Sequence, residues 1–107
     1  MYTRMVEVTA KPGKTDQLLE TMKDTVLRKL RSQPGFIDLV GLVSERNRSR
    51  LVAISFWDSK ESAERYHNEH FREIADMIRP CMDKEPTVDT FQVDTSTFHH
   101  IAAGKAA

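Results

Sequence analysis

Two histidines three residues apart, His67 and His70, are the side chains of this sequence best suited to acid–base chemistry. An imidazole has an unperturbed pKa near ~6.5, so at neutral pH it is partly uncharged and can accept a proton from a phenol. A base must also lie within hydrogen-bond reach of its substrate. The alternative is that the two histidines are a partly exposed pair on the shoulder of a helix, without a catalytic role. The sequence alone does not decide which histidine faces a pocket.

Aromatic and polar side chains near these histidines are candidates for holding a flat ligand. Trp57, the only tryptophan, offers a large apolar face and a directional N–H donor, but a tryptophan at a sheet edge can equally fill the core. Arg4 and Tyr66 are candidate polar contacts, and Phe71 and Ile74 are candidate apolar walls.

The same histidines could instead belong to a metal site. His67 and His70, with Glu64 and Glu73 at three-residue steps, resemble half of a carboxylate–histidine site. A complete site needs three or four converging ligands, and no second cluster in the sequence is placed to supply them. We therefore expect no metal and no other cofactor.

The stretch 51–80 must position these residues, because it reads as a strand, a tight junction and a helix. Asp58 follows a β-branched and aromatic run and is the predicted N-cap, with Glu61 three residues later as in a capping box. Proline at position 80 predicts the end of the helix nearby. Steps of three and four residues predict its inward face, made of Ala63, Tyr66, His67, His70, Phe71, Ile74 and Ile78.

The remaining elements are read from periodicity and from Pro-Gly breaks. Residues 14–32 carry one apolar face, which predicts an amphipathic helix. Strands are predicted over 2–9, 36–45, 51–57 and 87–94, with a polar hairpin turn over 46–50. The order strand, helix, strand, strand, helix, strand indicates an α+β, ferredoxin-like fold, with two helices on one face of an antiparallel sheet.

Both faces of the predicted strands 36–45 and 51–57 are largely apolar, whereas a sheet with one wet face would alternate. Two helices cover only one face of a small sheet. We therefore expect a homodimer whose sheets pack face to face. The alternative is that these are central strands which expose some apolar surface, as ordinary proteins do.

Length, charge and cysteine content limit the class of protein. The 107 residues predict one domain, 1–94, and a tail, 95–107, whose end we expect to be disordered although Phe98 and Ile101 could anchor it on a partner subunit. Sixteen basic residues balance sixteen acidic ones, which argues against nucleic-acid or membrane binding. A lone cysteine, Cys81, and the lack of a signal peptide or membrane span predict a soluble, cytoplasmic protein.

Four short segments make residues 2–94 resemble the antibiotic biosynthesis monooxygenase (ABM) domain family: Lys11-Pro12-Gly13-Lys14, Pro34-Gly35-Phe36, Phe56-Trp57-Asp58-Ser59 and His70-Phe71. The resemblance implies a dimeric α/β barrel of two ferredoxin-like units. It also implies either cofactor-free oxidation of phenols or quinols to quinones, or haem degradation. The haem-degrading branch pairs a first-strand asparagine with the junction tryptophan and a helix histidine. Here Trp57 matches, the first strand has no asparagine, and Ala75 stands where the histidine would fall.

The resemblance and the residues together lead to one hypothesis and a rival from a different class. The hypothesis is a cofactor-independent monooxygenase acting on a small aromatic substrate of phenol or hydroquinone type. His67 or His70 would be the base, Trp57 would stack on the substrate, and the pocket would exclude water. The rival is a non-catalytic dimeric barrel that binds a small ligand or serves a stress response. Haem binding or degradation is the less favoured third reading.

Overall fold

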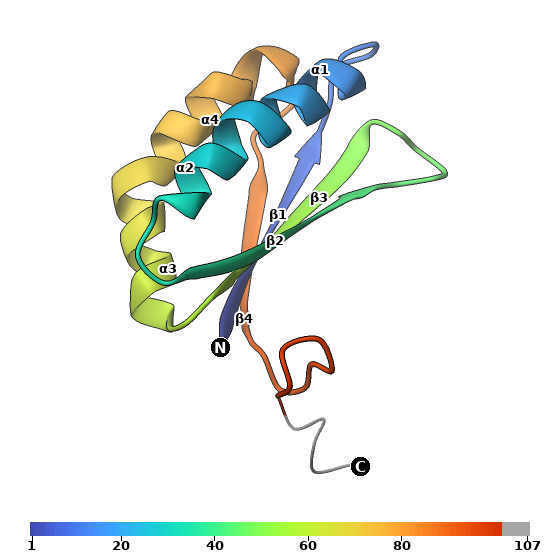
Figure 1. The fold of residues 1–107 in the computed structure, drawn as a ribbon. Helices are drawn as coiled ribbons and strands as arrows, with labels where there is room; N and C mark the ends of the chain where they lie inside the picture. The colour runs from blue at the N-terminus through green and yellow to red at the C-terminus, as the bar shows by residue number, and fades with distance from the viewer. Residues whose placement is uncertain (102–107) are drawn as a thin grey trace.

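A four-stranded antiparallel sheet, covered on one face by two long helical segments, forms the protein in the computed structural model, which describes residues 1–101 (Figure 1). The strands are β1 (Tyr2–Thr9), β2 (Phe36–Val43), β3 (Arg50–Trp57) and β4 (Thr87–Gln92), in the spatial order β2-β3-β1-β4. The predicted ferredoxin-like order is confirmed. Strands β2 and β4 each end two residues earlier than predicted.

Each helical segment contains a wide π turn at its middle. The first runs through α1 (Thr15–Thr21), the π turn η1 (Met22–Val26) and α2 (Leu27–Arg31). The second runs through α3 (Lys60–Tyr66), the π turn η2 (His67–Phe71), α4 (Arg72–Ile78) and a short 3-10 turn, η3 (Arg79–Cys81), which contains Pro80 as expected at the helix end. Such turns insert a residue into the helical repeat and are frequent at functional sites.

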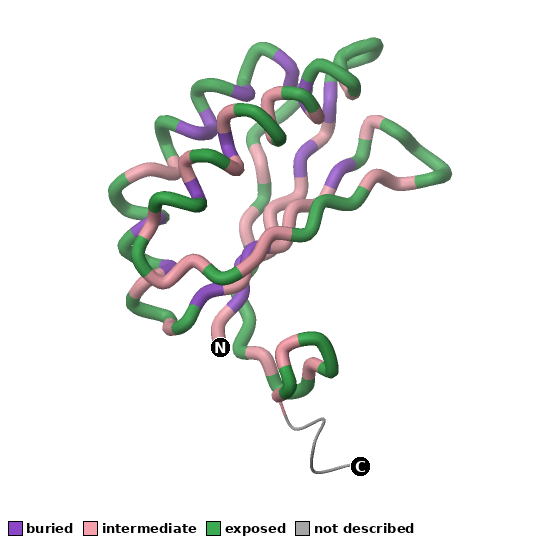
Figure 2. Tube along the Cα trace, viewed as in Figure 1, coloured by how far each residue is buried: buried purple, intermediate pink, exposed green. Residues whose placement is uncertain are grey.

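Strand β1 is central and has a clear inner face. It pairs with β3, with Arg4 opposite Ser55, and with β4, with Arg4 opposite Thr90. Side chains alternate along a strand. Arg4, Val6 and Val8 accordingly line the space between the sheet and the helices. The purple positions in Figure 2 lie mainly where helices and sheet face each other, which places the core in this layer.

The junction after β3 differs from the prediction by one residue. Ser59, not Asp58, is the N-cap of α3, and its hydroxyl accepts a hydrogen bond from the Ser62 amide at 3.2 Å. Asp58 still belongs to the strand pairing, because its amide donates to the Gly35 carbonyl at 2.9 Å. Gly35 has φ +83°, and a Cβ there would lie 2.4 Å from the Asp58 carboxylate. This tight approach fixes the path of the chain from β3 into α3.

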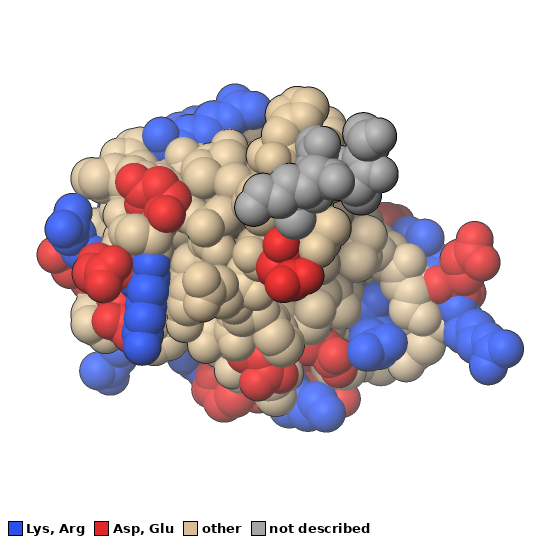
Figure 3. Space-filling model, turned by 90° about the horizontal axis from the view of Figure 1, so that it is seen from below, with Lys and Arg blue, Asp and Glu red and all other residues tan. Residues whose placement is uncertain are grey.

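The second face of the sheet carries no helix. Val40, Leu42 and Phe91 are exposed there, and the tail after β4 turns back so that the His99 ring lies 4.7 Å from the Phe56 ring. Phe98, a predicted anchor, is 78% exposed. Seen from below, charged side chains of both signs lie around the edge of the molecule, and an acidic side chain lies near the middle of a largely uncharged surface (Figure 3). The disorder expected at the chain end falls on residues 102–107, which lie outside the described residues.

None of the helices within residues 1–101 is long and apolar enough to cross a bilayer.

Candidate functional site

A buried arginine on the central strand is the focus of the site. Arg4 is 3% exposed, and its guanidinium lies 5.2 Å from the centre of the Tyr66 ring and 4.8 Å from that of Phe71. Aromatic faces attract a cation in this arrangement. Burial lowers the pKa of Arg4, and the neighbouring Tyr66 opposes this change. An arginine nonetheless stays protonated in proteins, so the site contains a fixed positive charge.

His67 is the hydrogen-bond partner of this arginine. Arg4 Nη2 lies 2.9 Å from His67 Nδ1, and since a guanidinium only donates, Nδ1 must be the unprotonated nitrogen. The proton of the neutral ring is therefore on Nε2. Desolvation and, next, the positive charge of Arg4 lower the pKa of His67 below its ordinary value. His67 is consequently an uncharged base at neutral pH.

The π turn η2 carries His67 and Phe71 at its two ends. Their rings stack with centres 5.1 Å apart and planes 19° apart. Both side chains contact Arg4, since residues four apart lie on the same side of a helix. The predicted inward stripe is correspondingly uneven: Ala63, Tyr66, Ile74 and Ile78 are buried, whereas His67 is exposed and His70 and Phe71 are intermediate.

Two cavities meet at Arg4. An inner cavity of about 40 Å³ lies between the sheet and the helices and is almost wholly apolar; its walls include Tyr66, Phe71 and Ile74, as predicted for an apolar pocket. An outer cleft of about 280 Å³ opens to solvent between α3 and the β1/β4 edge of the sheet. Arg4 lines both, and the cleft is completed by Tyr2, Ala63, Glu64, His67, Val88 and Thr90.

Trp57 is 0% exposed and lines neither cavity. Its ring stacks on Tyr66 at 5.1 Å and meets Phe36 edge-on at 5.6 Å, while its indole N–H donates to Ser55 Oγ at 2.9 Å. Trp57 therefore touches the site through the ring of Tyr66 and not through either cavity. Burial raises the pKa of Tyr66 against the opposing effect of Arg4, so its phenol remains protonated.

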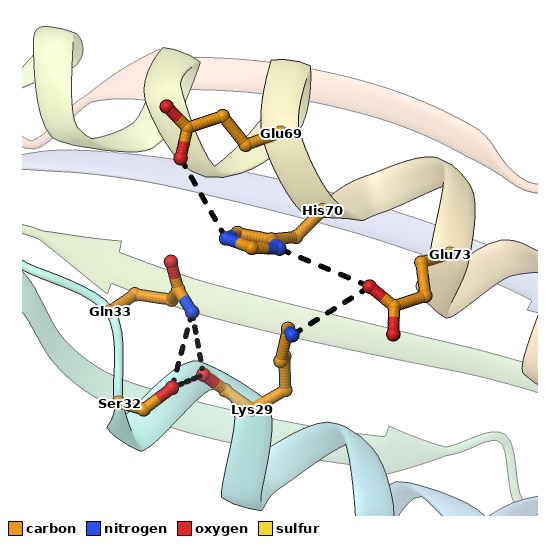
Figure 4. A network of polar contacts seen from close by, with 6 residues as sticks. All are labelled: Lys29, Ser32, Gln33, Glu69, His70 and Glu73. Atoms are coloured by element: carbon orange, nitrogen blue, oxygen red, sulfur yellow. Dashed lines mark hydrogen bonds and ion pairs between the residues drawn. The ribbon is translucent and has the colours of Figure 1, made fainter.

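His70 lies apart from Arg4, in the groove between the two helical segments (Figure 4). Its ring nitrogens are 3.7 Å from Glu69 and 4.0 Å from Glu73, and Glu73 also pairs with Lys29 of α2 at 3.6 Å. This network joins η2 and α4 to the end of the first helical segment. Within residues 1–101, no group of three or more His, Cys, Asp or Glu side chains is placed to hold a metal ion.

Sequence reasoning did not find several residues that line the outer cleft. Val88 and Thr90 enter the site only because β4 pairs with β1 in the register that sets Thr90 opposite Arg4. Tyr2 enters because it precedes Arg4 by two positions and so shares its face. The alternation of side chains along β1 could have predicted that Tyr2 shares a face with Arg4. Nothing in the sequence indicates the register between β1 and β4 that brings Val88 and Thr90 into the cleft.

Comparison with known proteins identifies the family. The sequence model for antibiotic biosynthesis monooxygenase matches residues 1–77, which is most of the chain. The chain belongs to the ABM family. No curated protein matches it.

Solved structures of ABM-like proteins share the fold. A monooxygenase from the ActVA-Orf6 gene of Streptomyces coelicolor, in complex with nanaomycin D, is 17% identical, with a TM-score of 0.75 over 89% of this chain and 88% of that one. A variant of SnoaB, a cofactor-independent oxygenase from Streptomyces nogalater, is 17% identical, with a TM-score of 0.70 and coverage of 90% and 95%. A conserved protein from Methanosarcina mazei is 22% identical, with a TM-score of 0.72 and coverage of 86% and 92%.

The contact between Arg4 and His67 predicts the titration of this histidine. Its pKa should lie below ~6.5 in the native protein and should rise in Arg4→Gln, because the repulsion by the guanidinium is removed. Proton NMR of the imidazole signals, assigned with His67→Gln, measures both values. Arg28→Gln, which removes an exposed arginine on α2, is the control and should leave the pKa unchanged.

The same pKa shift sets the sign of a pH effect on stability. Unfolded His67 has the higher pKa, so in the window just below pH ~6.5 the unfolded state binds more protons. The stability that His67 contributes is thus complete above this window and falls as the pH decreases through it. A His67 pKa at or above the ordinary value would contradict this account.

Proposed function

We propose that this protein is a cytoplasmic, cofactor-independent monooxygenase that oxidises a small aromatic substrate of phenol or hydroquinone type to a quinone. The observation that carries the proposal is the hydrogen bond between a neutral imidazole and a buried guanidinium, at the meeting point of an open cleft and an apolar cavity. Membership of the ABM family supports it. Such a site holds a base and a fixed positive charge beside space for a flat ring.

The first chemical step is removal of the phenolic proton. The substrate hydroxyl enters between Arg4 and His67 from the outer cleft, and its proton passes to His67 Nδ1. Arg4 then stabilises the phenolate oxygen by a charge-assisted hydrogen bond. Tyr66 stays protonated and holds the guanidinium from its far side, while Trp57 supports the Tyr66 ring. We assign the base to His67 rather than His70 because only His67 contacts Arg4.

The phenolate is the electron donor in the oxidation that follows. In a phenol, the ring carbon opposite the hydroxyl loses its hydrogen and gains one atom of dioxygen as a carbonyl oxygen; in a hydroquinone, a ring carbon that carries hydrogen gains this atom instead, which gives a hydroxyquinone. The second oxygen atom leaves as water, with the hydrogen removed from that carbon and the hydroxyl proton. The substrate supplies every electron, so the protein contributes orientation, a base and a partly dry environment.

Oxygen consumption by the metal-stripped protein, measured over a panel of hydroquinones and anthrone-like phenols, tests this function. His67→Ala should lower kcat/KM by about a hundredfold or more, the usual effect of losing a general base. His70→Ala is the matched control, since it removes an imidazole three residues away that lines neither cavity. Uptake no faster than in buffer with every substrate would favour the rival, a non-catalytic ligand-binding protein. Equal losses in both variants would contradict the assignment of His67.

We further propose that the protein is a homodimer through the helix-free face of the sheet. Leu42 on the edge strand β2 and Phe91 on the opposite edge strand β4 are 49% and 48% exposed on this face, and Val40 lies near Leu42 on β2. Exposed apolar side chains at both edges of one sheet face are typical of an interaction surface rather than of a free one. A partner sheet would bury them, as in face-to-face sheet packing.

Sedimentation velocity tests this assembly. Leu42→Glu should convert the dimer to a monomer, because the interface would bury an unpaired carboxylate. Met77→Glu adds the same charge at an exposed position on α4 and should leave the dimer intact. A monomeric wild-type protein at micromolar concentration, or a Leu42→Glu variant that remains dimeric, would overturn the proposed interface.

A further inference from the structure

Within residues 1–101, the charge of Arg4 has no opposite charge paired with it. Among the residues that the structure describes, the ion pairs of Lys and Arg side chains with carboxylates involve Lys29, Arg48, Arg50, Lys60 and Arg79, and none involves Arg4. Yet these paired side chains are largely on the surface, whereas Arg4 is 3% exposed. Buried charges are normally paired, because an uncompensated charge in a low-dielectric interior is strongly unfavourable.

The groups that surround the guanidinium are neutral. Tyr66 and Phe71 offer ring faces, and His67 offers a lone pair at 2.9 Å. The shifted pKa values of His67 and Tyr66 keep both uncharged at neutral pH. These contacts satisfy part of the hydrogen-bonding capacity of Arg4, which has five N–H donors, but they leave its charge uncompensated.

The outer cleft brings Arg4 within reach of a solute. The cleft has a volume of about 280 Å³, close to the lower limit of about 300 Å³ for small-molecule sites, and therefore suits one or two fused rings. Ala63 and Val88 form apolar walls for such a ring, and Tyr2 lies on the same sheet face as Arg4. A ligand that enters here with its ring along these walls presents its polar end to the guanidinium.

One other charged group lines this cleft. Glu64 is on α3, one turn before His67, and its carboxylate pairs with Lys60 at 3.8 Å rather than with Arg4. Its side chain is 58% exposed, so it belongs to the rim and its charge is screened by solvent. Glu64 weakly repels an anion at the mouth, whereas Arg4 attracts one at the buried end.

We infer that the site holds its substrate as an aromatic oxyanion, either an aryl carboxylate or the phenolate that remains when His67 has taken the phenolic proton, and that the charged oxygen takes the place of His67 as the partner of Arg4. This inference names the ionic form of the ligand and rests on the proposed function only for calling that ligand the substrate. An oxyanion accepts two N–H donors of a guanidinium in the fork geometry that carboxylates match best. Its binding also separates His67 Nδ1 from Arg4.

Calorimetric titration with a matched pair, 2-naphthoate and the isosteric 2-naphthamide, tests the charge preference without any turnover. The carboxylate should bind the wild-type protein about tenfold to a hundredfold more tightly than the amide, as expected for hydrogen bonds to a charged group. In Arg4→Gln this ratio should fall to about one. Glu64→Gln is the control from the same cleft; it should preserve the preference and slightly raise the affinity for the carboxylate.

Two further measurements on the wild-type protein test the preference for an anion and do not depend on whether Arg4→Gln folds. A nitrophenol that ionises near neutral pH should bind more tightly as its phenolate, which separates the phenolate from the carboxylate form of the ligand. The NMR signals of His67 should shift when 2-naphthoate binds to the wild-type protein, because the contact with Arg4 is replaced. A shift confined to other histidines would contradict the placement.

Equal affinity of wild-type protein for carboxylate and amide, absence of carboxylate binding at millimolar concentration, or a preference that survives in Arg4→Gln would each overturn the inference. These results are separable from the oxygenase test. Charge-dependent binding without oxygen uptake would leave the inference standing and remove the proposed function. Oxidation of phenols without any charge preference would support the proposed function and overturn the inference about the ionic form of the ligand.

Discussion

The buried charge of Arg4 is the constraint on which the rest of the site depends. The guanidinium on the central strand is almost fully buried, so the elements above it must supply most of its favourable contacts. Tyr66 and Phe71 do so with their ring faces and His67 with its lone pair. These contacts in turn determine the tautomer of His67 and lower its pKa. The pKa of the histidine thus depends first on its desolvation and second on the charge of Arg4 in the strand beneath it.

Two local features place the helix over that strand. The close approach of Gly35 to Asp58 and the Ser59 cap fix where α3 begins, and His67 and Phe71, at the two ends of the π turn η2, then both face Arg4. Trp57 contributes from below, because it packs against Tyr66 and holds this ring beside the guanidinium. Tyr66 thus belongs both to the aromatic core and to the site, because it packs on Trp57 and on Arg4.

The fold could be predicted from the sequence because its signals are local. Strand β1 was predicted with its observed ends, and the Pro-Gly breaks and apolar periodicity located the other elements. Asp58 was a reasonable N-cap by residue type, but backbone pairing with Gly35 moved the cap to Ser59. The site was harder to predict, since hydrogen bonding between residues 63 apart brings Arg4 to His67, and a π turn has no clear sequence signature. Sequence alone therefore supplied several residues of the site but not their partners, and it missed Tyr2, Val88 and Thr90 of the outer cleft.

The most direct test of the central claim is a crystal structure of the protein with a hydroquinone bound in the absence of oxygen. The account predicts an oxygen atom of the ligand within about 2.7–3.1 Å of both the Arg4 guanidinium and His67 Nδ1, with the ring in the outer cleft. The Arg4–His67 hydrogen bond should then be broken. A ligand bound elsewhere, with that hydrogen bond intact, would show that the buried arginine is structural and that the site lies in another part of the molecule.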